Sequence, residues 1–312
     1  MSDTWTAPAQ RIVSLLPSAT EIAYALGLDD RLVGVTHECD FPLRAREKPQ
    51  LTSSALPAAA SSAQIDRHVR RSLHEGSSLY ALDSALLERL NPDLIVTQEL
   101  CEVCAVSYAI VARAARRVRS DPRVVSLEPS SLEDVFANIL TVGELTGTAE
   151  RARAVIAELR LRVDALRAHV AGRRRPRTLV LEWTDPPMSG GHWTPGLVEL
   201  AGGEPLLAHP GANSQVLGWE AILAASPEVI LVAPCGYDLD ATLRAVAELA
   251  ALELWQRLAS DETVRIYALD GNAYVNRPGP RLVDTAELFA SAIGGQPYGA
   301  GSTDRRALQR LG

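Results

Sequence analysis

Short runs of β-branched residues alternate with helical patterns along almost the whole chain. This alternation is typical of parallel sheets covered by helices, because parallel strands need long crossover connections. The predicted strands are 11–16, 32–36, 93–98, 123–127, 178–183, 229–234 and 264–269, and the predicted helices between them include 18–26, 106–117, 132–145, 194–201 and 281–293. The sequence therefore predicts an α/β fold with Rossmann-like lobes.

The longest helical pattern lies in the middle of the chain, from residue 148 to about residue 171. Its apolar residues recur every three to four positions, which is the period of an α-helix. A complete set of strands and helices lies on each side of it. We therefore predict an N-terminal lobe over 1–146, a linking helix over 147–172 and a C-terminal lobe over 173–312.

The two halves of the chain also resemble each other. Residues 87–96 and residues 222–231 both read as a short helix, a turn made of a polar residue, a proline and an acid, and then a buried strand. A repeated pattern of this kind indicates a duplicated lobe. A local pattern, Ser18 followed by Glu21, predicts a capping box at the start of the first helix.

Composition excludes several classes of protein. Hydrophobic residues make up 47% of the 312 residues, charged residues make up 22%, and the net charge is −7. That balance excludes a disordered chain and argues against a general nucleic-acid binder, which needs clustered positive charge. No apolar window is long enough to cross a membrane. Residues 1–10 lack the features of a secretory signal, so as written the chain is expected to be cytoplasmic.

All four cysteines follow predicted strands, where ligands of parallel sheets bind. His37 and Cys39 follow one strand, Cys101 and Cys104 follow another, and Cys235 follows a third. One imidazole and three thiols within the first lobe are suitable ligands for zinc or iron. A cluster of free thiols, or a disulfide between Cys101 and Cys104, explains the same pattern. A redox or metal-dependent enzyme built on these two cysteines is a further alternative.

The strand ends of the second lobe carry aromatic and soft side chains instead. Trp183, Met188, Trp219 and Tyr274 would make apolar walls for a large flat ligand, although each tryptophan taken alone is better explained as loop packing. Arg277 follows the last strand and could pair with an acidic group on a ligand. No nucleophile motif, P-loop or dinucleotide fingerprint is present, so a binding protein is favoured over an enzyme. The polar stretch 61–80 predicts a surface helix and lid.

Several segments together resemble the vitamin B12-binding members of the class III, helical-backbone periplasmic binding proteins. The resemblance covers nearly the whole chain and is carried by residues 11–21, 32–42, 91–95, 186–190, 200–203, 226–230 and 277–281. It implies two αβ lobes joined by one long helix, with no catalysis. It also implies a corrinoid or related metal chelate held between the lobes and delivered to an ABC permease, and a periplasmic or extracellular location if an export segment was removed. We expect a monomer that binds no nucleic acid.

The resemblance also suggests which residues contact the ligand. Pro17, Trp183, Met188, Trp219 and Arg277 stand at matching positions. Glu38 and Gln98 stand where vitamin B12 binders often have aromatic residues, and residues 55–80 are an insertion relative to shorter family members. His37 or one of the cysteines could ligate the cobalt of a corrinoid.

Overall fold

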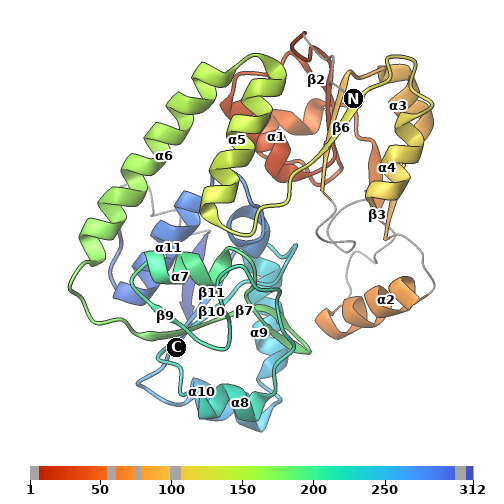
Figure 1. Cartoon of the computed structure of the whole chain (residues 1–312). Helices are drawn as coiled ribbons and strands as arrows, with labels where there is room; N and C mark the ends of the chain where they lie inside the picture. Colours follow the sequence, from red (N-terminus) through yellow and green to blue (C-terminus); the bar gives the residue numbers. More distant parts are fainter. Residues whose placement is uncertain (1–6, 55–60, 75–78, 99–106, 299–306, 312) are drawn as a thin grey trace. The chain divides into compact units, whose positions relative to one another are not determined.

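The computed structural model describes residues 7–54, 61–74, 79–98, 107–298 and 307–311 (Figure 1). The chain divides into two compact units. Unit 1 comprises Met1–Ala59, Arg67–Glu128 and Glu133–Glu158, and unit 2 comprises Ala60–Asp66, Pro129–Leu132 and Leu159–Gly312. Each unit is an αβ lobe built on a parallel sheet, as the alternation of strands and helices predicted.

Unit 1 contains a four-stranded parallel sheet in the order β2-β1-β5-β6. Its strands are β1 (Ile12–Ser14), β2 (Leu32–Gly34), β5 (Leu94–Thr97) and β6 (Arg123–Ser126), and its helices include α1 (Pro17–Ala25), α3 (Ser84–Leu90), α4 (Tyr108–Ala115) and most of α5 (Leu132–Thr146). A 3₁₀ turn, η1 (Leu43–Glu47), follows β2, and β3 (Thr52–Ser54) pairs antiparallel with β4 (Tyr80–Leu82). Between β3 and β4 the chain forms helix α2 (Ser62–His74).

Unit 2 contains a six-stranded sheet whose central strands β9, β7, β10 and β11 are parallel. Its strands are β7 (Arg177–Thr184), β8 (Pro187–Ser189), β9 (Glu204–Pro205), β10 (Val229–Val232), β11 (Arg265–Leu269) and β12 (Leu308–Leu311), where β8 and β12 are antiparallel to their neighbours. Its helices are α7 (Thr194–Leu200), α8 (Trp219–Ala224), α9 (Leu239–Leu249), α10 (Glu253–Ala259) and α11 (Leu282–Gly294), with a π-helical turn η2 (Gly271–Val275) after β11.

The predicted duplication is visible in the strand orders. The strand order β2-β1-β5-β6 in the sheet of unit 1 corresponds to the order β9-β7-β10-β11 in the sheet of unit 2. The acidic residue of the repeated turn accepts backbone hydrogen bonds in both units. Asp93 accepts from the N–H groups of Gln10 and Arg11, at 2.8 and 2.9 Å. Glu228 accepts from the N–H of Arg177 at 2.9 Å. Each acid thereby fixes the start of a neighbouring parallel strand, which explains the repeated turn.

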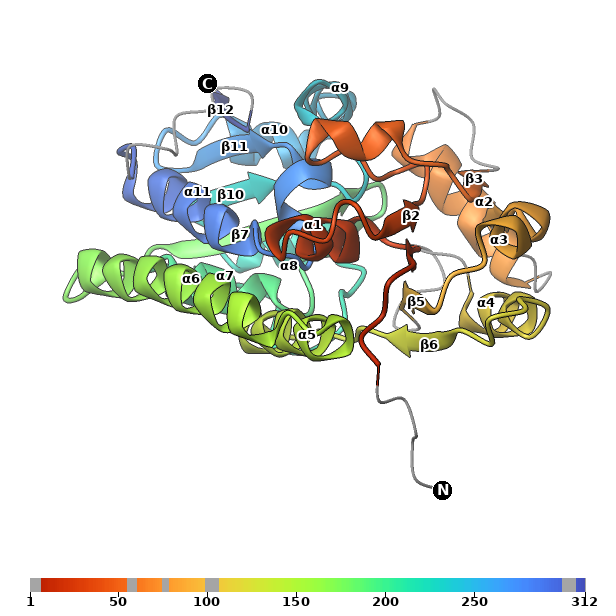
Figure 2. The same ribbon diagram turned by 90° about the horizontal axis from the view of Figure 1, so that it is seen from above.

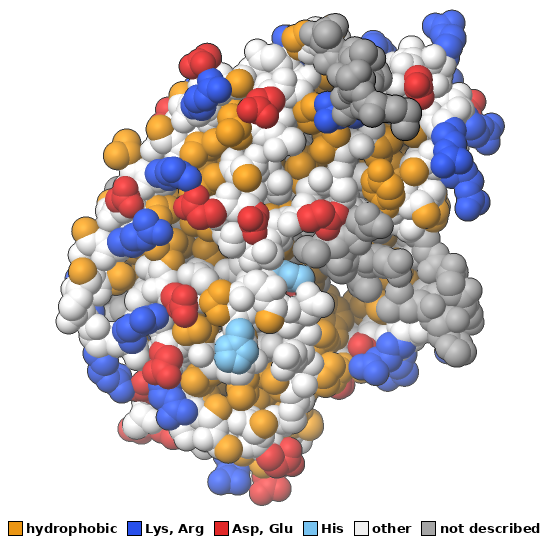
Figure 3. All heavy atoms as spheres, viewed as in Figure 1, with side chains coloured by type: hydrophobic (Ala, Val, Ile, Leu, Met, Phe, Trp, Pro, Cys, Tyr) orange, Lys and Arg blue, Asp and Glu red, His pale blue; other side chains and the backbone are white. Residues whose placement is uncertain are grey.

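Helix α6 (Ala149–Val170) confirms the predicted long helix and runs from unit 1 into unit 2. Its buried stripe includes Ala152, Leu159 and Leu166. Acidic and basic side chains are interspersed along its outer face (Figure 3). Within unit 2 it lies beside α11 (Figure 2), because Arg162 donates to Asp284 at 2.5 Å and to Glu287 at 2.7 and 3.0 Å. No helix in the described part of the chain has both the length and the apolar character needed to cross a bilayer.

The predicted capping box at Ser18 and Glu21 is wrong. Helix α1 begins at Pro17, and Leu16 precedes it as the N-cap residue without a side-chain hydrogen bond. Proline is well suited to a first helical position because its missing N–H would have no partner there. Ser18 is therefore already inside the helix, where its hydroxyl cannot cap the first turn.

Gly271 permits the close approach of η2 to the end of β10. A Cβ atom at this position would lie 2.4 Å from the carbonyl oxygen of Pro234 and 2.8 Å from backbone atoms of Ala233. These are backbone atoms of the segment that directly follows the central strand β10, so they cannot move aside easily. We expect Gly271→Ala to lower the free energy of unfolding by about 1–3 kcal/mol, measured by urea denaturation. Gly196→Ala, which meets nothing within 4 Å, is the control and should not lower stability, because alanine favours the helix α7 more than glycine does.

Candidate functional site

The carboxyl ends of β7 and β10 form the aromatic edge of unit 2. The ring of Trp183, the penultimate residue of β7, lies edge-on to Tyr237, which follows β10, with 5.4 Å between ring centroids. The indole N–H of Trp183 donates to the carbonyl oxygen of Asp185 at 3.1 Å. Both aromatic residues are partly exposed. Trp183 is one of the predicted ligand contacts, and that contact stays a prediction. Tyr237 also follows a strand but was not singled out from the sequence.

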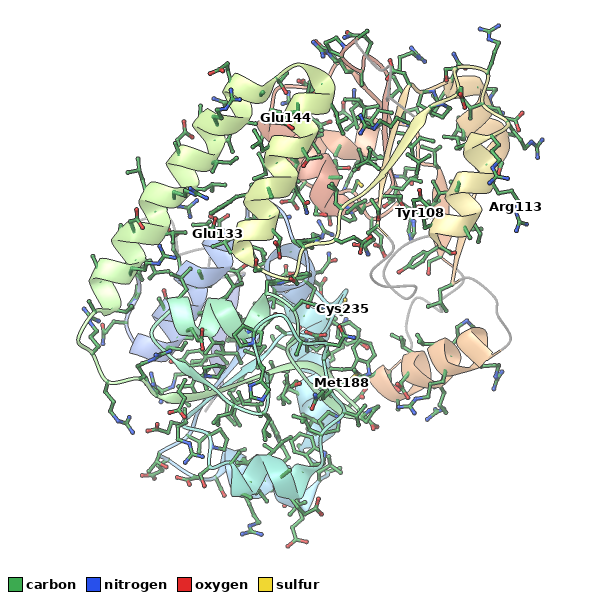
Figure 4. All side chains as sticks on the ribbon, in the orientation of Figure 1. Tyr108, Arg113, Glu133, Glu144, Met188 and Cys235 are labelled. Carbon is green, nitrogen blue, oxygen red and sulfur yellow. The ribbon has the colours of Figure 1, made fainter. Side chains whose placement is uncertain are left out.

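Met188 and Cys235 also belong to this part of unit 2. Met188 lies in β8 directly opposite Trp183 in the antiparallel pair. Cys235 follows β10, is partly exposed and carries a free thiol. Figure 4 shows the two side chains at the same side of unit 2. The aromatic edge therefore combines two aromatic rings, a thioether and a thiol, all of which suit an apolar, polarisable ligand.

The η2 turn joins this edge through backbone and side-chain bonds. The N–H of Asn272 donates to the carbonyl oxygen of Tyr237 at 2.9 Å. Arg277 is only 5% exposed, and its guanidinium donates to the side chain of Asn272 at 3.0 Å. Tyr274 is partly buried, with the guanidinium of Arg281 over its ring at 5.5 Å. Arg277 thus stabilises its own loop, and its pairing with an acidic group of a ligand stays a prediction.

Trp219 has a different environment from the one expected for a ligand wall. It begins α8 and packs edge-on against the buried Trp255, with 5.8 Å between centroids. It is one of the partly buried residues around the core of unit 2. This packing favours the alternative prediction of loop packing for Trp219, whose side chain is also partly exposed.

A short segment of α2 reaches the aromatic edge. Thr184 donates a hydrogen bond from its hydroxyl to the hydroxyl oxygen of Ser62 at 2.8 Å, and the Ser62 hydroxyl lies 3.3 Å from that of Tyr237. Ser62 is 1% exposed and Thr184 is 2% exposed. Nothing in the sequence pattern placed Ser62 here, because the two residues are separated by more than a hundred positions.

In unit 1, the segment that follows β2 carries a polar group of side chains around His37. The ring nitrogen Nδ1 of His37 lies 2.7 Å from the hydroxyl oxygen of Thr52, which also accepts the backbone N–H of His37 at 3.2 Å. The ring of Tyr80 lies 5.7 Å from that of His37, and its hydroxyl donates to Glu38 at 3.2 Å. The antiparallel pair β3–β4 therefore orients His37 and Glu38, a role for Thr52 and Tyr80 that sequence reasoning missed.

The proposed set of metal ligands is not assembled in the described residues. Cys39 is 1% exposed, and its thiol lies 3.0 Å from the hydroxyl of Thr20, so it is a buried packing residue rather than an open ligand. Cys101 and Cys104 lie outside the described residues. No group of three or more His, Cys, Asp or Glu side chains able to hold a metal occurs in the part of the chain that the structure describes.

Two further predicted contacts lie at the strand ends of unit 1. Pro17 is partly buried at the first position of α1, directly after β1. Gln98 is partly buried directly after β5. Both are placed where ligands of parallel sheets bind, and their contact with a ligand stays a prediction.

Glu182 supports the loops behind the aromatic edge. Its carboxylate accepts hydrogen bonds from the N–H of Gly191, at 3.0 Å, and from the hydroxyl of Ser214. Burial raises the pKa of Glu182 above its ordinary value of 4.5, while the hydrogen bonds from Ser214 and Gly191 oppose the rise. The buried environment of Glu182 therefore disfavours the charged form of its carboxyl group.

This burial predicts a pH dependence of stability. A carboxyl whose pKa is raised in the folded state contributes stability that is fully present below pH 4.5 and is lost as the pH rises through the folded-state pKa. We expect Glu182→Gln to lose less stability than the unmodified protein as the pH rises from 4.5, because the amide carries no charge. Urea denaturation of both proteins over this range measures the difference, and parallel curves would contradict the prediction. Exposed Glu253→Gln is the control.

The chain matches a family model and a relative of known name over most of its length. Residues 12–273 match the model of a family described as periplasmic binding protein. The chain is 24% identical to a vitamin B12-binding protein of Vibrio cholerae over 297 residues, which cover 92% of this chain and 90% of the relative.

Two solved structures show the same fold. The periplasmic vitamin B12 binding protein of Vibrio cholerae matches with a TM-score of 0.66 and 24% identity, covering 92% of this chain and 97% of that one. A periplasmic heme binding protein from Pseudomonas aeruginosa matches with a TM-score of 0.71 and 20% identity, covering 97% and 98%.

Proposed function

Because the chain belongs to the periplasmic binding protein family, whose members bind solutes and are not enzymes, we propose that it binds a metal-bearing tetrapyrrole, with a corrinoid as the first candidate. We further propose that it delivers this ligand to an ABC permease and that it acts in the periplasm or outside the cell. A monomeric state stays a prediction.

The observation that carries the ligand class is the aromatic edge of unit 2. Trp183 and Tyr237 are partly exposed rings beside Met188, at the strand ends where parallel sheets bind ligands. Aromatic faces and a thioether match the large apolar surface of a macrocycle. The similarity to proteins named for vitamin B12 and for heme supports the same class of ligand.

His37 supplies a reason to favour a macrocycle that carries a metal. The hydroxyl oxygen of Thr52 can accept both the backbone N–H and the Nδ1–H of His37, which leaves a lone pair on Nε2. A histidine that binds metal through one nitrogen usually donates from the other to a fixed acceptor. We therefore propose His37 as an axial ligand of the bound cobalt or iron.

Spectroscopic titration tests the function directly. Purified protein is mixed with cyanocobalamin, aquocobinamide or haemin, and visible spectra are recorded together with equilibrium dialysis. We expect saturable binding of at least one of the three at micromolar concentration or below, with a shifted spectrum for a chelate that has an open axial position. Zinc chloride is the matched control for a bare metal. Binding of zinc alone, or of none of the four, would refute the proposal.

A further inference from the structure

Helix α2 lies between β3 and β4 of unit 1, yet its first residues belong to unit 2. The division falls at Asp66, so that residues 60–66 are grouped with the aromatic edge and the rest of the helix with unit 1. Val69, from the later part, packs beside the core of unit 1. The segment Ser61–Asp66, which contains the first turn of α2, is therefore attached to unit 2 separately from the rest of the helix. The residues that make this attachment indicate the role of the segment.

The attachment is a chain of hydroxyl groups rather than an apolar contact. Ser62 accepts from Thr184 at 2.8 Å and lies 3.3 Å from the hydroxyl of Tyr237. Both partners stand at the strand ends of unit 2, and Tyr237 is in ring contact with Trp183. Ser62 of this segment thus contacts the hydroxyl groups of Thr184 and Tyr237. Both hydroxyls belong to the edge to which the proposed function assigns the ligand.

The segment covers the polar part of the edge, where Thr184 lies, while the aromatic rings stay partly exposed. Ser62 and Thr184 are almost completely buried, at 1% and 2% exposure, and the Ser62 hydroxyl satisfies both neighbouring hydroxyls. By contrast, Gln64, Arg67 and Arg70 of the same helix are exposed. A ligand that reaches Thr184 and the hydroxyl of Tyr237 must first remove Ser62.

We propose that Ser61–Asp66 is a lid on the ligand-binding edge of unit 2, held closed by the Ser62 hydroxyl and displaced when the macrocycle binds. This inference rests on the proposed function. The lid makes binding selective, because a ligand must provide enough contact with the aromatic edge to replace the two hydrogen bonds. A small polar solute cannot do so.

The lid predicts that weakening it strengthens binding. The apparent dissociation constant equals the intrinsic one divided by the fraction of open molecules. Ser62→Ala removes both hydrogen bonds, so we expect aquocobinamide to bind about tenfold more tightly. Tyr237→Phe removes one bond and keeps the ring, and it should give a smaller gain. Ser260→Ala, an exposed serine at the end of α10, is the control and should bind like the unmodified protein.

Hydrogen exchange of residues 61–66 gives an independent readout. These amides should exchange faster in Ser62→Ala without ligand and faster in the unmodified protein when aquocobinamide is added. Weaker binding by Ser62→Ala, or slower exchange of 61–66 on ligand addition, would mean that the segment contacts the ligand instead and would overturn the lid. Binding that is unchanged by the substitution would also overturn it, while leaving the proposed function intact. No binding of any chelate by either protein would refute both.

Discussion

His37→Ala should weaken binding of aquocobinamide roughly 100-fold. Loss of a residue that merely orients a metal ligand typically costs 10- to 100-fold in affinity, so loss of the ligand itself should reach at least the upper end of that range. The visible spectrum of the bound cobinamide should also change, because water replaces the imidazole on cobalt. Spectroscopic titration measures both effects in one experiment.

Two further variants separate ligation from a structural role. Thr52→Val removes the hydroxyl 2.7 Å from Nδ1 but keeps the side-chain shape, and it should weaken binding about tenfold with the imidazole spectrum retained. His37→Gly should regain the original spectrum when free imidazole is added. If His37→Ala binds as well as the unmodified protein and with the same spectrum, His37 is not an axial ligand, even though the tetrapyrrole itself still binds.

The sequence predicted the arrangement of the strands and helices well because these depend on local patterns. The stripe of α6 that includes Ala152, Leu159 and Leu166 is apolar at helical spacing, and the buried strands are short β-branched runs. The repeated acid of each lobe was also visible, and the structure shows its purpose at Asp93 and Glu228. Short antiparallel elements such as β12 were missed, because four residues with no clear alternation carry little signal.

The surroundings of the candidate site residues could not be predicted, because they depend on contacts between residues far apart in the sequence. Strand-end position singled out His37 and Trp183 as candidates, yet it could not separate Cys39, whose thiol is buried against Thr20, from an open ligand. It also did not show that Trp219 packs on Trp255. Composition and spacing do not show which side chains after a strand are buried. The packing of Cys39 and Trp219 therefore required the three-dimensional structure.

Trp183→Ala should reduce the affinity for the macrocycle by a factor of about 30 to 1,000. An aromatic residue that anchors an apolar ligand contributes about 2–4 kcal/mol when truncated, and tenfold in affinity corresponds to about 1.4 kcal/mol. Trp183 is partly exposed, lies edge-on to Tyr237 and is paired with Met188 in the sheet, so its removal deletes the largest ring of the aromatic edge. Equilibrium dialysis with cyanocobalamin and with haemin measures the loss for both ligand types.

Matched tryptophan variants make this result specific to the edge. Trp183→Phe keeps an aromatic face and should retain most of the affinity. Trp219→Phe alters a tryptophan that packs on Trp255, so it should lower the thermal midpoint while leaving ligand affinity unchanged. Equal losses of affinity in Trp183→Ala and Trp219→Phe would instead indicate that general loosening of unit 2 weakens binding. Both residues are tryptophans, but Trp183 lies at the aromatic edge and Trp219 packs on Trp255. The difference in ligand affinity between their variants therefore separates direct contact with the ligand from support of the fold.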